Sequence, residues 1–79
     1  MKIATNLFAS LACYKPEGIG RDSWMVECEE GMMVSTLLQG IGVPLQEVSL
    51  IFINGVHAKM ESVLKDGDRL GIFPPVGGG

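Results

Sequence analysis

Apolar and polar residues alternate from Lys2 to Leu11, which is the period of a strand with one buried face. Ile3, Thr5, Leu7 and Ala9 form the predicted inner side, and Phe8 is an outward exception. A second alternation puts Trp24, Val26 and Cys28 on one side of a strand that ends near residues 29–31. The segment 13–22 contains proline and glycine, so we expect a loop that joins two antiparallel strands.

From residue 34 the apolar positions change to a helical period. Val34, Leu37, Leu38 and Ile41 follow the spacing i, i+3, i+4 and i+7, which predicts one apolar stripe on a short helix. Gly40 or Gly42 can end this helix in a left-handed cap, and Pro44 prevents its continuation. Its start is weakly specified, because Met32 and Met33 stand where a serine, threonine or aspartate cap is preferred. We expect both methionines to pack, the alternative being an exposed apolar surface.

The segment 48–53 is rich in β-branched and aromatic residues and leads directly into Asn54-Gly55, a strong hairpin-turn signal. Val56–Ala58 is then the short return strand. Leu50 and Phe52 alternate with Ile51 and Ile53, and the pattern alone does not tell which pair faces the core.

The last predicted strand is Arg69–Phe73, with Leu70 and Ile72 directed inward and Phe73 outward. Before it, Leu64 is expected to fill the core, and the sequence Lys-Asp-Gly-Asp at residues 65–68 predicts a tight turn. The carboxylates of Asp66 and Asp68 are a candidate metal pair, but turn formation explains both of them.

The predicted order is strand, strand, helix, strand, short strand, strand. This order indicates an α+β protein in which a mixed sheet of about five strands packs on one helix. With the last strand beside the first, the arrangement is a β-grasp, or ubiquitin-like, fold. We expect residues 1–73 to form this domain and residues 74–79 to form an extended C-terminal tail.

Composition narrows the function. A chain of 79 residues has a small core and little room for an internal active site, so an autonomous enzyme is not expected. The net charge of −3 argues against nucleic-acid binding, which needs clustered lysine and arginine. No apolar run approaches the length of a membrane span, and the first residues do not resemble a signal peptide, so we expect a cytoplasmic protein without membrane contact.

Metal and thiol chemistry are not indicated either. Cys13 and Cys28 match no zinc or redox spacing, and we expect free thiols because the predicted hairpin holds them too far apart for a disulfide. His57 is the single histidine and has no ligand or triad partner at a suitable spacing, so it is expected at the surface. We predict no bound metal and no bound cofactor.

The final residues, Phe73-Pro74-Pro75-Val76-Gly77-Gly78-Gly79, are the candidate functional site. Two prolines stiffen the exit from the last strand, and three glycines leave the terminal carboxylate without bulky neighbours. Such a tip fits a narrow channel in another protein, where the carboxylate can be activated by adenylation with ATP and attacked by a nucleophile. The alternative is a frayed terminus without function.

The sequence Asp-Gly-Asp-Arg-Leu at residues 66–70, followed by Ile-Phe-Pro-Pro-Val and terminal glycines, resembles the closing signature of the MoaD/ThiS sulfur carriers. The small subunit of molybdopterin synthase is the nearest match within that group. The resemblance implies that Gly79 is adenylated by a ubiquitin-activating-type adenylyltransferase and converted to a thiocarboxylate, the one catalytic position. It also implies that Gly77 and Gly78 thread the partner's active site, while Phe73, Pro74, Pro75 and Val76 bind and position the tail.

In the molybdopterin branch, the resemblance further implies that the large synthase subunit is the acceptor, and that the sulfur enters the molybdenum or tungsten cofactor. Three alternatives stay open. A thiamine-type sulfur carrier has a similar glycine-rich ending, and a ubiquitin-like modifier would join Gly79 to a lysine of a target protein. A plain interaction domain would instead use outward apolar residues such as Phe8, Phe73 and one of the pair Ile51 and Ile53.

Overall fold

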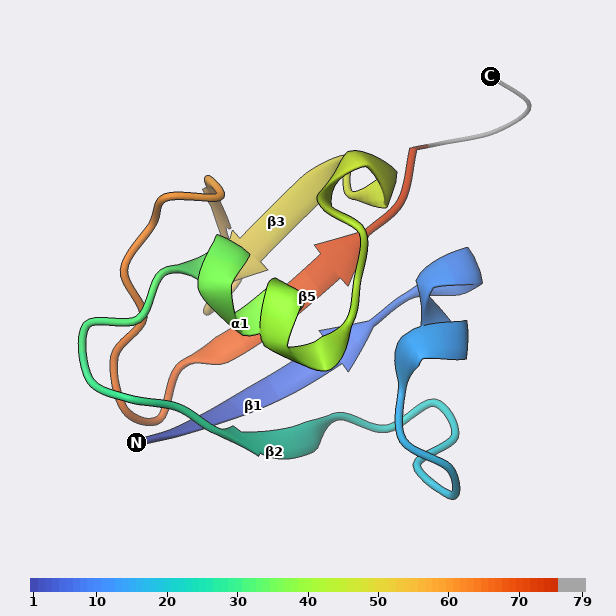
Figure 1. The fold of residues 1–79 in the computed structure, drawn as a ribbon, viewed down its shortest axis with the longest axis horizontal. Coiled ribbons are helices and arrows are strands. Elements are labelled where there is room, and N and C mark those ends of the chain that lie inside the picture. The colour runs from blue at the N-terminus through green and yellow to red at the C-terminus, as the bar shows by residue number, and fades with distance from the viewer. Residues whose placement is uncertain (76–79) are drawn as a thin grey trace.

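The computed structural model describes residues 1–75. One mixed sheet has the strand order β2-β1-β5-β3-β4, and a single α-helix lies across one of its faces (Figure 1). The elements are β1 (Lys2–Leu7), the 3-10 helix η1 (Ala9–Tyr14), β2 (Trp24–Glu27), α1 (Val34–Ile41), the 3-10 helix η2 (Leu45–Glu47), β3 (Leu50–Ile53), β4 (Val56–Ala58) and β5 (Arg69–Phe73). The predicted β-grasp arrangement is confirmed. No helix in residues 1–75 is long and apolar enough to cross a membrane.

The first and last strands are neighbours at the centre of the sheet. β1 and β5 are parallel, with Ala4 opposite Arg69 and Leu7 opposite Ile72. β2 returns antiparallel along the other side of β1, as the loop at 13–22 predicts. β3 pairs antiparallel with β5, so the end of the last strand lies beside the start of β3, where Leu50 is opposite Phe73.

The first strand is shorter than predicted. It ends at Leu7, and Ala9 adopts a positive φ of 52°, which breaks the extended backbone and starts η1. Leu11 is therefore fully buried from a helical turn, whereas Ala9, predicted on the inner side, is exposed. The period-2 pattern was misleading here because both conformations bring an apolar residue at position 11 to the core.

The helix has the predicted stripe, with Val34, Leu37 and Leu38 buried, and Gly42 ends it at φ 100°. Its start has no side-chain cap. Instead, the backbone amides of Val34 and Ser35 donate to the carbonyls of Ser62 and Met60, at 3.0 and 2.9 Å. The segment before β5 thus supplies the acceptors that a capping residue normally provides.

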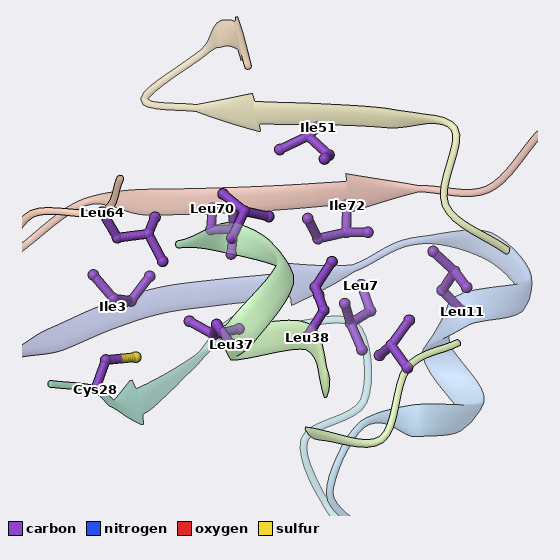
Figure 2. Close-up of a cluster of buried hydrophobic side chains, with 12 residues drawn as sticks. Ile3, Leu7, Leu11, Cys28, Leu37, Leu38, Ile51, Leu64, Leu70 and Ile72 are labelled. Carbon is purple, nitrogen blue, oxygen red and sulfur yellow. The ribbon is translucent and has the colours of Figure 1, made fainter. Parts of the chain in front are cut away.

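The core lies between α1 and the inner face of the sheet (Figure 2). Leu37 and Leu38 point from the helix toward aliphatic side chains of β1, β3 and β5. The most buried side chains of the cluster are Ile3, Leu7, Leu11, Val34, Leu38, Leu64, Leu70 and Ile72. Leu64 fills the core as predicted. Of the two methionines before the helix, Met32 packs against this cluster and Met33 is exposed, so the expectation of packing holds for one of them.

Side-chain hydrogen bonds join the turn before β5, residues 65–68, to the turn between β3 and β4. Asn54 and Gly55 have φ angles of 53° and 79° and form the predicted two-residue hairpin between β3 and β4. Asn54 Nδ2 donates to Asp68 at 2.8 Å, and Asn54 Oδ1 accepts from the Arg69 amide at 2.9 Å. Asp68 also accepts the backbone amide of Lys65 at 2.8 Å. This network fixes the start of β5 against the hairpin.

Candidate functional site

The last strand leads directly into the predicted tail. β5 ends at Phe73, whose carbonyl accepts the amide of Ser49 at 2.8 Å, and Pro74 and Pro75 follow as half-buried and exposed residues. Val76, Gly77, Gly78 and Gly79, the other residues predicted at the site, lie outside the described part of the chain. The division into a domain of residues 1–73 and a tail of residues 74–79 therefore stays a prediction.

Phe73 belongs to an aromatic cluster on the sheet face opposite the helix. Its ring stacks on that of Phe8 with 4.3 Å between centroids and 3° between planes. Phe52 approaches Phe73 edge-on at 5.7 Å, and His57 approaches Phe52 edge-on at 5.8 Å. Stacked and edge-to-face pairs at these separations are the favourable geometries for aromatic rings. Three strands thus contribute to one apolar surface beside the exit of the tail.

A pocket of about 430 Å³ lies beside the rings of Phe8, Phe52 and Phe73, and we call it the aromatic pocket. It is formed by Ala4, Asn6, Phe8, Ser23, Phe52, Gly55, Arg69, Leu70, Gly71 and Phe73. Ligand pockets in proteins range over roughly 300–1,000 Å³, so this pocket has room for one or two side chains of another molecule.

The charge at the pocket is positive although the chain is acidic. Arg69 is the only charged residue among those that form it, and within residues 1–75 its guanidinium makes no hydrogen bond or salt bridge. Two more basic residues lie beside the pocket residue Asn6. Lys15 Nζ donates to Asn6 Oδ1 at 2.7 Å, and Asn6 Nδ2 donates to the carbonyl of Arg21 at 3.1 Å. None of the residues that form the pocket carries a carboxylate, and Asp68, next to Arg69 in the chain, accepts a hydrogen bond from Asn54.

The structure decides the open question about β3. Ile51 is 4% exposed and Ile53 packs against the core, so neither is an outward residue. The expectation that one of them belongs to an outer apolar surface is wrong, and Phe52 takes that place instead. Sequence reasoning left both pairs of β3 open, because the alternation is apolar on both sides. The register that pairs Phe52 with Gly71 was the information that would have placed it on the outer face.

The other candidate groups have structural roles. Asp66 accepts the Lys2 amide at 2.7 Å and Asp68 belongs to the turn network, in agreement with the turn interpretation. Among residues 1–75 no three histidine, cysteine or acidic side chains gather in a group suited to a metal. Cys13 and Cys28 are free thiols, as expected, and His57 is exposed.

Two side chains outside the pocket have shifted pKa values. The hydrogen bond from the Tyr14 hydroxyl to Glu47, at 3.0 Å, raises the pKa of Tyr14 above 10.0 because the carboxylate stabilises the protonated phenol. Burial raises the pKa of the Cys28 thiol, and the N-terminal ammonium opposes this shift. A buried thiol with a raised pKa reacts slowly, so Cys28 is a core residue.

The order of strands, the single helix and the strand that runs out into the tail define a ubiquitin-like β-grasp protein. The sequence pattern of the Mut7-C ubiquitin family matches residues 1–77. The chain belongs to this family.

Solved structures agree with this assignment. A Pyrococcus furiosus protein assigned as molybdopterin converting factor subunit 1 is 29% identical, with 95% of this chain and 98% of that chain covered and a TM-score of 0.69. Small archaeal modifier protein 1 of Haloferax volcanii is 26% identical over the whole of both chains, with a TM-score of 0.69.

A complex of subunits 1 and 2 of the molybdopterin-converting factor from Helicobacter pylori contains a chain of the same fold, 23% identical over the whole of both chains, with a TM-score of 0.59. No curated protein sequence matches significantly. The predicted resemblance to the MoaD/ThiS group of ubiquitin-like proteins is confirmed.

Proposed function

We propose that this protein is a sulfur carrier whose terminal carboxylate, on Gly79, becomes a thiocarboxylate that donates sulfur in molybdopterin biosynthesis. The observation that carries the proposal is the continuity between the central strand and the tail: β5 ends at Phe73 and the sequence continues as Pro-Pro-Val-Gly-Gly-Gly. The similarity to a protein assigned as molybdopterin converting factor subunit 1 favours this branch.

The chemistry requires an outside enzyme. A terminal carboxylate is ionised at neutral pH and is a poor acyl donor. In the proposed reaction, a carboxylate oxygen of Gly79 attacks the α-phosphorus of ATP, and pyrophosphate leaves. A hydrosulfide equivalent then attacks the carbonyl carbon and displaces AMP, which leaves the thiocarboxylate. The activating partner is a ubiquitin-activating-type adenylyltransferase, which binds the ATP.

Geometry limits where that partner binds. Six residues follow Phe73, and a fully extended segment of this length reaches at most about 20 Å. An enzyme that acts on Gly79 therefore contacts the folded body close to Phe73. The aromatic pocket is the apolar surface of the described chain that includes Phe73 itself, so we propose it as the docking surface.

The acceptor is proposed by analogy. The Helicobacter pylori structure contains subunit 1 together with subunit 2 of its converting factor. We propose that the corresponding large subunit accepts the sulfur from this chain, in the cytoplasm. A thiamine-type carrier would form the same thiocarboxylate and transfer it to a different acceptor.

The direct test is the intact mass of the protein isolated from its own cells. The proposal expects a chain that ends at Gly79 and a fraction in which one oxygen is replaced by sulfur. Incubation with the large synthase subunit and the pterin precursor should remove this sulfur. Deletion of Gly79 should abolish the sulfur-containing fraction and therefore the transfer of sulfur to the precursor. The control variant, Glu61→Ala at an exposed residue, should keep both. A chain that continues past Gly79, or a thiocarboxylate that survives every acceptor, refutes the molybdopterin role.

The second candidate is a protein modifier. It is favoured by the 26% identity, over the whole of both chains, with small archaeal modifier protein 1. In this case Gly79 forms an isopeptide with a lysine of a target, and higher-mass conjugates appear that vanish when Gly79 is deleted. Both functions need the same adenylation, so the mass of the products distinguishes them.

A further inference from the structure

β2 lies at the edge of the sheet, and its outer side has no partner strand in residues 1–75 (Figure 1). In an antiparallel pair, residue pairs that exchange two hydrogen bonds alternate with pairs that exchange none. Met1 and Cys28 exchange two, at 2.7 and 2.8 Å, so the next bonded pair along β2 contains Val26. The backbone amides and carbonyls of Met25 and Glu27, on either side of Val26, therefore point away from the sheet.

This edge carries few of the features that protect edge strands. Proline, lysine, a bulge or a very short strand normally prevents the pairing of another chain. The register of β2 with β1 is continuous over residues 24–27, which contain no proline or lysine, and their one charge is that of Glu27. Met25 is 60% exposed, and within residues 1–75 no backbone hydrogen bond from a loop reaches the outward groups of β2. Since the opposite edge strand, β4, has only three residues, β2 is the edge that can accept a further strand.

A groove of about 180 Å³ lies between this edge and the helix. It is formed by Val26, Glu27, Cys28, Met32, Thr36, Leu37, Gly40 and Ile41, of which only Glu27 is charged. The side chain of Val26 packs against the core and so points to the helix side of the sheet. In a strand added to β2, every second side chain would point to this side as well, toward the groove. An apolar cavity of about 150 Å³ admits benzene, so the groove has room for one aliphatic side chain.

Gly40 leaves part of this groove open. It lies inside α1, where alanine is more stable than glycine. Its φ is not positive, and an added Cβ would meet no atom within 4 Å, so neither the backbone nor the packing requires glycine here. A larger side chain at this position therefore has room, and it would occupy the groove from the side of the helix.

The carboxylates beside the edge indicate the charge of the partner. Glu27, Glu29 and Glu30 are exposed at the C-terminal end of β2, and no basic residue forms the groove. A complementary segment therefore has lysine or arginine beside these three residues. A second copy of β2 fits this requirement poorly, because residues 21–30 carry four carboxylates and one arginine.

We propose that the edge of β2 binds an extended segment of another protein by strand addition. One aliphatic side chain of that segment lies in the groove between β2 and α1, and a lysine or arginine lies beside Glu27, Glu29 and Glu30. Main-chain hydrogen bonds to Met25 and Glu27 hold the segment, while the groove and the carboxylates select its sequence. The proposal is independent of the carrier function, because none of these residues belongs to the tail.

The experiment titrates the full isotope-labelled chain, by two-dimensional NMR, with the peptide acetyl-Lys-Lys-Thr-Val-Thr-Val-Thr-amide. The amide signals of Met25, Glu27 and Gly40 should shift. A peptide methylated on its three central amides, which leaves neither edge able to donate, should bind about fivefold more weakly or worse. A peptide with two glutamates in place of the lysines should bind about twofold more weakly or worse.

Two pairs of variants separate the backbone from the groove. Met25→Pro removes an outward amide but no hydrogen bond to β1, so it should fold and weaken the lysine peptide by about threefold or more. Its matched control, Met25→Thr, keeps the amide and should bind as the wild type does. Gly40→Leu should weaken the peptide by about tenfold or more because it fills the groove. Its control, Gly40→Ala, should melt at a higher temperature than the wild type and still bind.

Several results would overturn the proposal. These are the absence of any shift up to the solubility limit of the peptide, shifts confined to another face, and equal affinities for the methylated and unmethylated peptides. Equal binding to the wild type and to Gly40→Leu would overturn the part assigned to the groove. Self-association of the chain through β2 in analytical ultracentrifugation would assign the edge to a second copy instead. Deletion of Gly79 should leave peptide binding unchanged although it abolishes the proposed carrier function, so the two proposals fail separately.

Discussion

Asn54 links a backbone conformation to a hydrogen-bond network, and two substitutions separate these contributions. Its φ of 53° is one that alanine adopts at a cost of about 1–2 kcal/mol and glycine adopts without that cost. Its side chain makes two exposed hydrogen bonds, to Asp68 at 2.8 Å and from the Arg69 amide at 2.9 Å. Each such bond contributes about 0.5–1.5 kcal/mol net. The two bonds together give about 1–3 kcal/mol, so we expect Asn54→Gly to lower the free energy of unfolding by about 1–3 kcal/mol and Asn54→Ala, with the backbone cost added, by about 2–5 kcal/mol.

The measurement is urea unfolding of both variants beside the wild type, repeated by thermal melting. For a domain of this size each kcal/mol corresponds to about 4–8 °C in Tm. A double-mutant cycle with Asp68→Ala isolates the contact to the carboxylate, and its coupling energy should be about 0.5 kcal/mol or more. Equal stabilities of the glycine and alanine variants would refute the backbone contribution. A coupling energy of zero would refute the role of the contact between Asn54 and Asp68.

Three further predictions concern the core and the two shifted pKa values. Leu64→Ala should lower the free energy of unfolding by about 2–5 kcal/mol in urea titrations, because Leu64 is 1% exposed. The control is Val63→Ala at the exposed neighbouring residue, which should change this free energy little. A thiol reagent should modify the exposed Cys13 at once and Cys28 only as fast as the protein opens; equal rates would contradict the burial of Cys28. Tyr14 is the single tyrosine, so the phenolate absorbance reports on it alone. In a pH titration the midpoint of this absorbance should lie above the ordinary pKa of 10.0. The stabilisation from its hydrogen bond is present below pH 10 and lost above it, and Glu47→Gln should lower the midpoint.

Much of the fold was predictable because its signals are local. The helical stripe at Val34–Ile41 and the Asn54-Gly55 hairpin each follow from residues adjacent in the chain, and the structure places them within a residue or two of the prediction. The end of β1 was not predictable, because the positive φ falls on Ala9, a residue that gives no turn signal. The helix start was weakly specified for a related reason, since its acceptors come from the distant carbonyls of Met60 and Ser62.

The candidate site was predictable in part. The place of Phe73 at the end of the last strand, facing outward, follows from the local alternation of residues 69–73. The role of the tail stays a prediction. The aromatic pocket does not follow from the sequence, since it exists only when Phe8, directly after β1, meets Phe52 of β3 and Phe73 of β5.

The central position of the first and last strands affects how the protein is made. β1 has two neighbours in the sheet, and one of them, β5, is synthesised after all the other strands. While residues 69–73 are still inside the ribosome, the sheet lacks its middle strand, and β3 has no neighbour except β4. Contacts between residues so far apart in sequence also slow folding. The nascent chain therefore completes its native sheet only after residues 69–73 have left the ribosome, and until then its exposed apolar strands are prone to aggregate.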